Sequence, residues 1–143
     1  MNFRFISLTF NDIIMNIVPW LVISLRSIPE GDDFMNLYAV SFFGHRQIDN
    51  VFVIEQRLET MIRELLLSKE YVEFLVGRDG EFDQLVASTV RRCKRTIRDD
   101  NSALVLILPY ATAEYRYNEQ SFHEYYDEIE ICAESAEKHF KSA

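Results

Sequence analysis

Three short apolar runs, separated by segments with helical periodicity, constrain the fold of this chain most strongly. They are "LYAVSFF" at 37–43, "YVEFLV" at 71–76 and "SALVLILPY" at 102–110, the last stopped by Pro109. Near-continuous apolar runs of this length predict strands buried in a sheet, and their alternation with helices predicts that the strands are mainly parallel. The sequence therefore predicts an α/β fold.

The two segments between the runs each predict one helix. In the first, apolar residues recur at steps of three and four from Val51 to Leu65, and Asp49 or Asn50 can cap its start. The second helix is predicted from about Glu81 to Arg98. Beyond the third run, the aromatic-rich stretch predicts a loop and a helix from about Glu119. A short strand in "EIEIC" and a helix in "AESAEKHFKSA" follow.

Composition excludes several classes of protein. The chain has 143 residues, 48% of them hydrophobic, which is enough for one globular domain with a buried core. The net charge of -8 disfavours general binding to a nucleic acid backbone. Cys93 and Cys132 show no metal-type spacing, with each other or with the histidines, and they favour a reduced, cytoplasmic setting. We expect no metal, no cofactor and no membrane partner.

Residues 1–34 do not match the rest of the chain. The apolar stretch from Ile13 to Leu25 is short for a membrane span and is interrupted by Asn16 and Pro19. A membrane or export segment and an extra element packed on the domain are two interpretations. In a third, the codons of Glu30-Gly31-Asp32 contain a ribosome-binding site, and translation starts at Met35. We therefore predict a non-native or poorly packed extension over 1–34 and a domain over 35–143.

The candidate site lies where the predicted strands end. The segments there are "GHR", "GRDG" and "PY". Open α/β sheets bind ligands beyond the carboxyl ends of their strands, at a topological switch point. We therefore expect the three strand ends to converge on one crevice.

The segments "FFGHRQI", "FLVGRDGEFDQLVA" and "LILPY" resemble the YspA-like family. That family belongs to the SLOG superfamily of Rossmann-like domains, together with the DNA-processing protein DprA and the cytokinin-activating LOG enzymes. The resemblance covers roughly residues 35–143. It implies a Rossmann-like three-layer sandwich and a nucleotide or a nucleotide-derived ligand.

The resemblance also implies which residues face the ligand, namely a first turn, a second turn and a proline that closes the crevice. These are Gly44, His45 and Arg46; Gly77, Arg78, Asp79, Gly80 and Asp83; and Pro109.

Two features depart from the family. Arg78 stands where a second glycine is more usual, and Glu81 precedes Phe82. The family also continues into further strands, so we expect a sheet that is incomplete on its C-terminal side. One edge of the strand at 37–43 would then be unpaired.

Each candidate in the first turn has a functional and a structural interpretation. Arg46 could grip a phosphate or carboxylate, or it could pair with Asp49 or Asp83. His45 could orient a ligand or take part in acid–base chemistry, or it could be a turn residue bonded to backbone.

The second turn offers the same choice. Gly77 and Gly80 suit either a close approach to a ligand or a tight turn. Asp83 could tie down loop amides in the first turn of the helix. Glu81 or Asp83 could instead be a catalytic acid or base, although the LOG pattern Gly-Gly-x-Gly-Thr-x-x-Glu is not reproduced.

Two further clusters of residues each have two interpretations. "RRCKR" at 91–95 is either an anion-binding patch or a solvated helix face. Tyr110, Tyr115 and Tyr117, with Arg116 among them, could stack on a base or pack against the neighbouring helix.

These observations favour a nucleotide-binding sensor or adaptor domain rather than an enzyme. A nucleoside or nucleotide hydrolase related to the LOG enzymes is the alternative. A binder of single-stranded DNA in the manner of DprA is a third interpretation, which the acidic balance opposes. The sequence also leaves open whether the chain forms a homo-oligomer.

Overall fold

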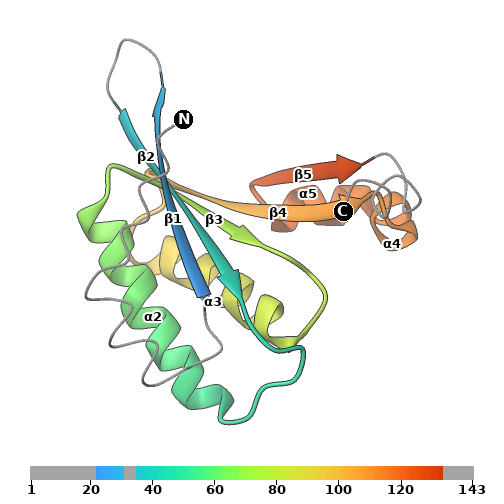
Figure 1. Ribbon diagram of the computed structural model, residues 1–143, viewed down its shortest axis with the longest axis horizontal. Coiled ribbons are helices and arrows are strands. Elements are labelled where there is room, and N and C mark those ends of the chain that lie inside the picture. Colours follow the sequence, from blue (N-terminus) through green and yellow to red (C-terminus); the bar gives the residue numbers. More distant parts are fainter. Residues whose placement is uncertain (1–21, 31–34, 134–143) are drawn as a thin grey trace.

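The computed structural model describes residues 22–30 and 35–133, which form one sheet with helices packed against it (Figure 1). The sheet has five strands in the order β1-β2-β3-β4-β5. Strands β2 to β5 are parallel and β1 is antiparallel to β2, which confirms the α/β fold and the mainly parallel sheet. The strands are β1 (Val22–Glu30), β2 (Met35–Phe43), β3 (Tyr71–Val76), β4 (Ser102–Tyr110) and β5 (Glu128–Ala133).

Four helices connect the parallel strands. They are α2 (Val51–Ser68), α3 (Glu81–Thr96), α4 (Ala113–Tyr117) and α5 (Glu119–Tyr125). Because β2 to β5 follow one another in sequence order, right-handed crossovers place these helices on the same face of the sheet. The described parallel sheet and its helices are consistent with the expected Rossmann-like sandwich, and the strand order has no reversal that would make a switch point.

The core lies between this helical layer and the face of the sheet that it covers. Val40, Phe74 and Leu104 are aligned across β2, β3 and β4, and each is 0% exposed. Alternate residues of the same strands extend the row, and the inner sides of α2 and α3 cover it. Burial of this apolar surface is the main force that holds the helices to the sheet.

Strand β1 pairs with β2 along its whole length, from Val22 opposite Phe43 to Glu30 opposite Met35. The edge of β2 that we expected to be unpaired therefore carries a strand. Pairing of this kind is what an extra element of the domain would show. The domain boundary at Met35 stays a prediction, and the helix predicted beyond residue 133 lies outside the described residues.

The start of α2 differs from expectation. Asn50 occupies the cap position, but its side chain makes no capping hydrogen bond, and its backbone is left-handed with φ 56°. Its carbonyl oxygen accepts from the amides of Val53 and Ile54, as the cap residue of a helix ordinarily does. The left-handed backbone at this position is a conformation that asparagine adopts more readily than most residues.

Polar side chains hold the C-terminal parts of α2 and α3 in place. The buried side-chain amide of Asn101 donates to the carbonyls of Leu66 and Lys69, at 2.9 and 3.0 Å, and so satisfies the C-terminus of α2. Lys94 donates to the Ser102 carbonyl at 2.6 Å and pairs with Asp127 at 2.8 Å. These bonds join the end of α2 to the turn before β4, and join α3 to the start of β4 and to Asp127, just before β5.

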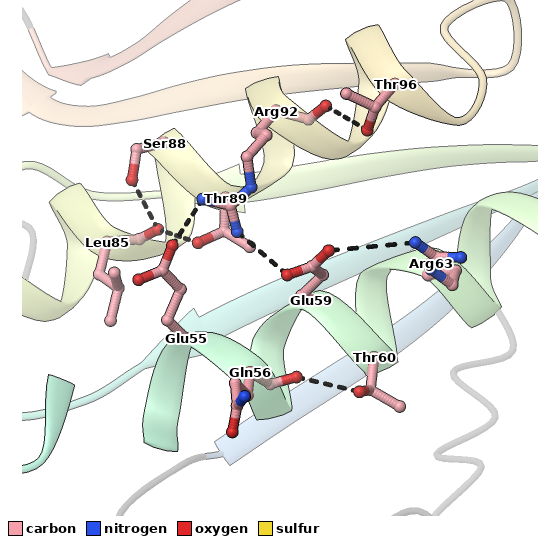
Figure 2. Close-up of polar contacts among 10 residues, drawn as sticks. All are labelled: Glu55, Gln56, Glu59, Thr60, Arg63, Leu85, Ser88, Thr89, Arg92 and Thr96. Atoms are coloured by element: carbon pink, nitrogen blue, oxygen red, sulfur yellow. Dashed lines mark hydrogen bonds and ion pairs between the residues drawn. The ribbon is translucent and has the colours of Figure 1, made fainter. Parts of the chain in front are cut away.

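The basic cluster at 91–95 is largely engaged within the fold. Figure 2 shows Arg92 of α3 reaching Glu55 and Glu59 of α2. The Arg91 guanidinium lies 4.0 Å from the centre of the Tyr125 ring. Together with Lys94, these cations join elements of the domain, as the structural interpretation of the cluster expects.

Among the described residues, no helix is long and apolar enough to cross a membrane.

Candidate functional site

The loops that follow β2 and β3 are joined backbone to backbone. The Glu81 amide at the start of α3 donates to the Arg46 carbonyl at 2.8 Å. In return, the Glu81 carboxylate accepts from the Ile48 amide at 3.1 Å. We call this contact between residues 44–50 and 77–81 the loop junction. It fixes the position of the first turn of α3 relative to the end of β2.

Glycines allow the loop junction to close. A Cβ atom on Gly80 would lie 2.6 Å from Arg46 Cα, nearer than real Cβ contacts come. Gly80 has φ -163°, a conformation open to any residue, so the close approach explains the glycine. A Cβ atom on Gly44 would collide with the Phe82 ring, which is part of the core.

Asp83 fastens the second loop to the helix. Its carboxylate accepts from the Asp79 amide at 3.1 Å and lies beside Gly77. Burial raises the pKa of Asp83, and the charge of Asp79 adds to that effect. The position and bonding of Asp83 match the structural interpretation made from the sequence.

Arg78 is held by a second set of contacts. Its guanidinium makes two bonds to the Glu114 carboxylate, the shorter of 2.9 Å, and donates to the Tyr126 hydroxyl at 3.2 Å. It also lies 4.4 Å from the centre of the Phe122 ring. The hydrogen bond from Arg78 lowers the pKa of Glu114, whereas burial raises the pKa of Tyr126. Arg78 thus links the second loop to α4 and α5.

A shallow groove of about 690 Å³ runs over the outer side of α3, between the first loop and the end of α5. Its two tyrosines are in edge-to-face contact, with ring centres 4.8 Å apart. The only charged groups among its lining residues are one arginine and one glutamate. The groove is lined by Ile48, Val51, Arg78, Glu81, Gln84, Leu85, Ala87, Ser88, Tyr125 and Tyr126.

The predicted site residues fall into three groups. Arg78 and Glu81 line the groove. The second group lies beside it and builds the loop junction or the turn of the second loop. The members of this group are Gly44, Arg46, Gly77, Asp79, Gly80 and Asp83.

The third group, His45 and Pro109, is not among the residues that line the groove. Sequence reasoning missed Gln84, Ser88, Tyr125 and Tyr126. The two tyrosines of the "EYYDE" segment were a weak signal, because ligand pockets are lined mainly by apolar and aromatic side chains.

The second loop is not built as a general phosphate cradle. Such cradles use free backbone amides at a helix N-terminus. Here the Asp79 amide is taken by Asp83 and the Glu81 amide by Arg46, while two carboxylates occupy the first turn of α3. The groove is therefore better suited to a polar aromatic group than to a polyphosphate.

Two tyrosines that follow the third strand differ in burial. Tyr115 is buried and meets the Phe122 ring edge-on at 5.5 Å, so it packs within the domain. Tyr117 is 87% exposed. Within the described ranges, no group of three or more histidine, cysteine, aspartate or glutamate side chains is placed to hold a metal ion.

Comparison with known proteins returned no matching family model, no matching curated protein and no matching solved structure. The resemblance to the YspA-like family therefore stays a prediction from the sequence.

The loop junction makes Gly80 far less replaceable than Gly77. We expect Gly80→Ala to lower the free energy of unfolding by about 1–3 kcal/mol, because the new methyl group meets backbone atoms of Arg46. Gly77→Ala meets only the Asp83 carboxylate, at 3.0 Å, and should stay within about 1 kcal/mol. Urea denaturation of both variants measures the difference. Equal losses would contradict the loop junction.

The raised pKa of Asp83 predicts a pH-dependent effect of Asp83→Asn. Folding favours the protonated carboxyl, so its contribution is present in acid and is lost as the pH rises through the folded pKa. The asparagine oxygen can still accept from Asp79. The variant should therefore gain stability relative to the natural protein between about pH 3 and pH 7.

Urea denaturation across this pH range measures the effect. Asp99→Asn, which removes an exposed charge elsewhere, is the control. If the stability of Asp83→Asn relative to the natural protein falls with rising pH, the prediction is wrong. The hydrogen bond from the loop amide would then stabilise the charged carboxylate more than burial destabilises it.

Proposed function

We propose that this domain binds a nucleotide or a nucleotide derivative in the groove over α3 and acts as a sensor or adaptor. The observation that carries the proposal is the composition of the groove. It places the Arg78 guanidinium and two tyrosine rings near the polar side chains of Gln84 and Ser88. The half-buried Tyr125 ring offers a surface for base stacking, with the buried Tyr126 packed against it, and the polar groups suit the edges of a base or a sugar.

Charge limits which part of the ligand each group can hold. The Arg78 charge is already paired with Glu114, and the loop amides of Asp79 and Glu81 are engaged. Arg46 is exposed on the first loop, and its carbonyl accepts from the amide of Glu81, which lines the groove. We infer that its guanidinium meets a phosphate of the ligand. A ligand with few phosphates fits this arrangement better than a triphosphate.

Thermal unfolding with a panel of nucleosides, nucleotides and nucleotide derivatives tests the proposal. At a concentration 100 times its Kd, a ligand of this site should stabilise the protein by about 2.7 kcal/mol, visible as a rise in Tm. Ser88→Trp should abolish the rise, because Ser88 lines the groove and is exposed. Arg46→Ala should reduce the rise for phosphorylated ligands only.

The control for this experiment is Ser68→Trp. Ser68 is exposed at the other end of the helical layer, where α2 ends. This variant should respond to ligand like the natural protein. A panel without any stabilising member, or an equal response from Ser88→Trp, would contradict the proposal.

A hydrolase of nucleosides or nucleotides is the second candidate, because the Glu81 carboxylate lies in the wall of the groove. Release of a free base or a sugar phosphate would be abolished by Glu81→Gln if Glu81 is the acid–base group. A glutamine at this position can still accept from the Ile48 amide, so the loop junction survives the change. Release that is unchanged in the variant would contradict this role.

Binding of single-stranded DNA in the manner of DprA is not supported by the arrangement of charges. The chain carries a net charge of -8, and Arg91, Arg92 and Lys94 of the 91–95 cluster are engaged with Tyr125, with Glu55 and Glu59, and with Asp127.

A further inference from the structure

The outer edge of β5 is a separate candidate surface, independent of the groove. Within the described part of the chain, β5 pairs with β4 on one side and ends the sheet on the other (Figure 1). It spans six residues and contains no proline. An edge strand of this kind offers backbone N–H and C=O groups to a further strand.

The side chains of β5 alternate between two chemistries. Ile129 and Ile131 are aligned with Leu106 and Leu108, so they point to the face of the sheet that the helices cover. Glu128 and Glu130 point to the opposite face, and both are exposed. Ile131 is also 39% exposed, so the edge presents an acidic face and a partly apolar one.

A second copy of this chain is a poor partner for the edge. Symmetric antiparallel pairing keeps the same face of both sheets aligned, so each residue meets one of the same parity. Glu128 and Glu130 would then meet each other or Cys132 across the interface. Like charges directly opposite one another are destabilising, and two chains of net charge -8 repel.

We propose that β5 binds an extended segment of another protein that alternates basic and apolar residues. The segment adds a sixth strand to the sheet through backbone hydrogen bonds. Its lysines or arginines pair with Glu128 and Glu130, and its apolar side chains cover the exposed part of Ile131. The acidic face selects this partner and rejects self-pairing by the same charges.

The test uses the full chain and a fluorescent peptide of about eight residues that alternates lysine and valine. Fluorescence anisotropy should show saturable binding, and a peptide of scrambled order should bind much less tightly. Glu128→Gln with Glu130→Gln should weaken binding about fivefold or more, because two cross-strand ion pairs are lost. Hydrogen exchange should show protection of the β5 amides when the peptide is bound.

The control removes the same amount of charge elsewhere. Glu64→Gln with Glu124→Gln changes two exposed glutamates on α2 and α5 and should leave the affinity within about twofold. Equal weakening by both double variants would show general charge attraction and overturn the proposal, as would absence of binding. If the protein alone, without peptide, self-associates and its β5 amides are protected, the edge binds a second copy of the chain and the proposal is wrong.

Discussion

The row of buried residues across β2, β3 and β4 is the constraint on which the rest of the structure depends. Val40, Phe74 and Leu104 are aligned in the sheet and fully buried under α2 and α3. Because the parallel strands follow one another in order, the described helices all pack on this one face. The loops that enter α2 and α3 therefore lie at the same end of the sheet, close enough to bond to each other.

The segment "GRDGEFDQ" shows how a motif typical of ligand binding can be used for structure. Gly80 lets the chain approach Arg46, Glu81 accepts from the first loop, and Asp83 accepts from the second. These bonds consume the amides that a phosphate would need. What they leave on the surface is a groove whose far wall is supplied by Tyr125 and Tyr126. The motif holds the groove in shape, and residues outside the motif complete it.

The strands and longer helices could be predicted from sequence because their apolar periodicity is a local property. Asp83 could also be placed, since a carboxylate in the first turn of a helix has few structural partners. The groove could not be predicted from the sequence, because its walls meet only through tertiary contacts such as that of Arg78 with Tyr126, 48 positions apart. Val51 shows the same limit. Its place in the helical stripe predicts burial, yet it is 46% exposed where α2 borders the groove.

NMR titration of the isotope-labelled protein with individual nucleotides and nucleosides tests most directly the proposal that the groove over α3 is the ligand site. The proposal predicts saturable changes in the backbone signals of the groove residues, centred on Gln84, Ser88 and Tyr125. Signals from the far end of α2, around Ser68, should not move. Changes confined to other parts of the domain, or no change with any member of the panel, would contradict the assignment of the site.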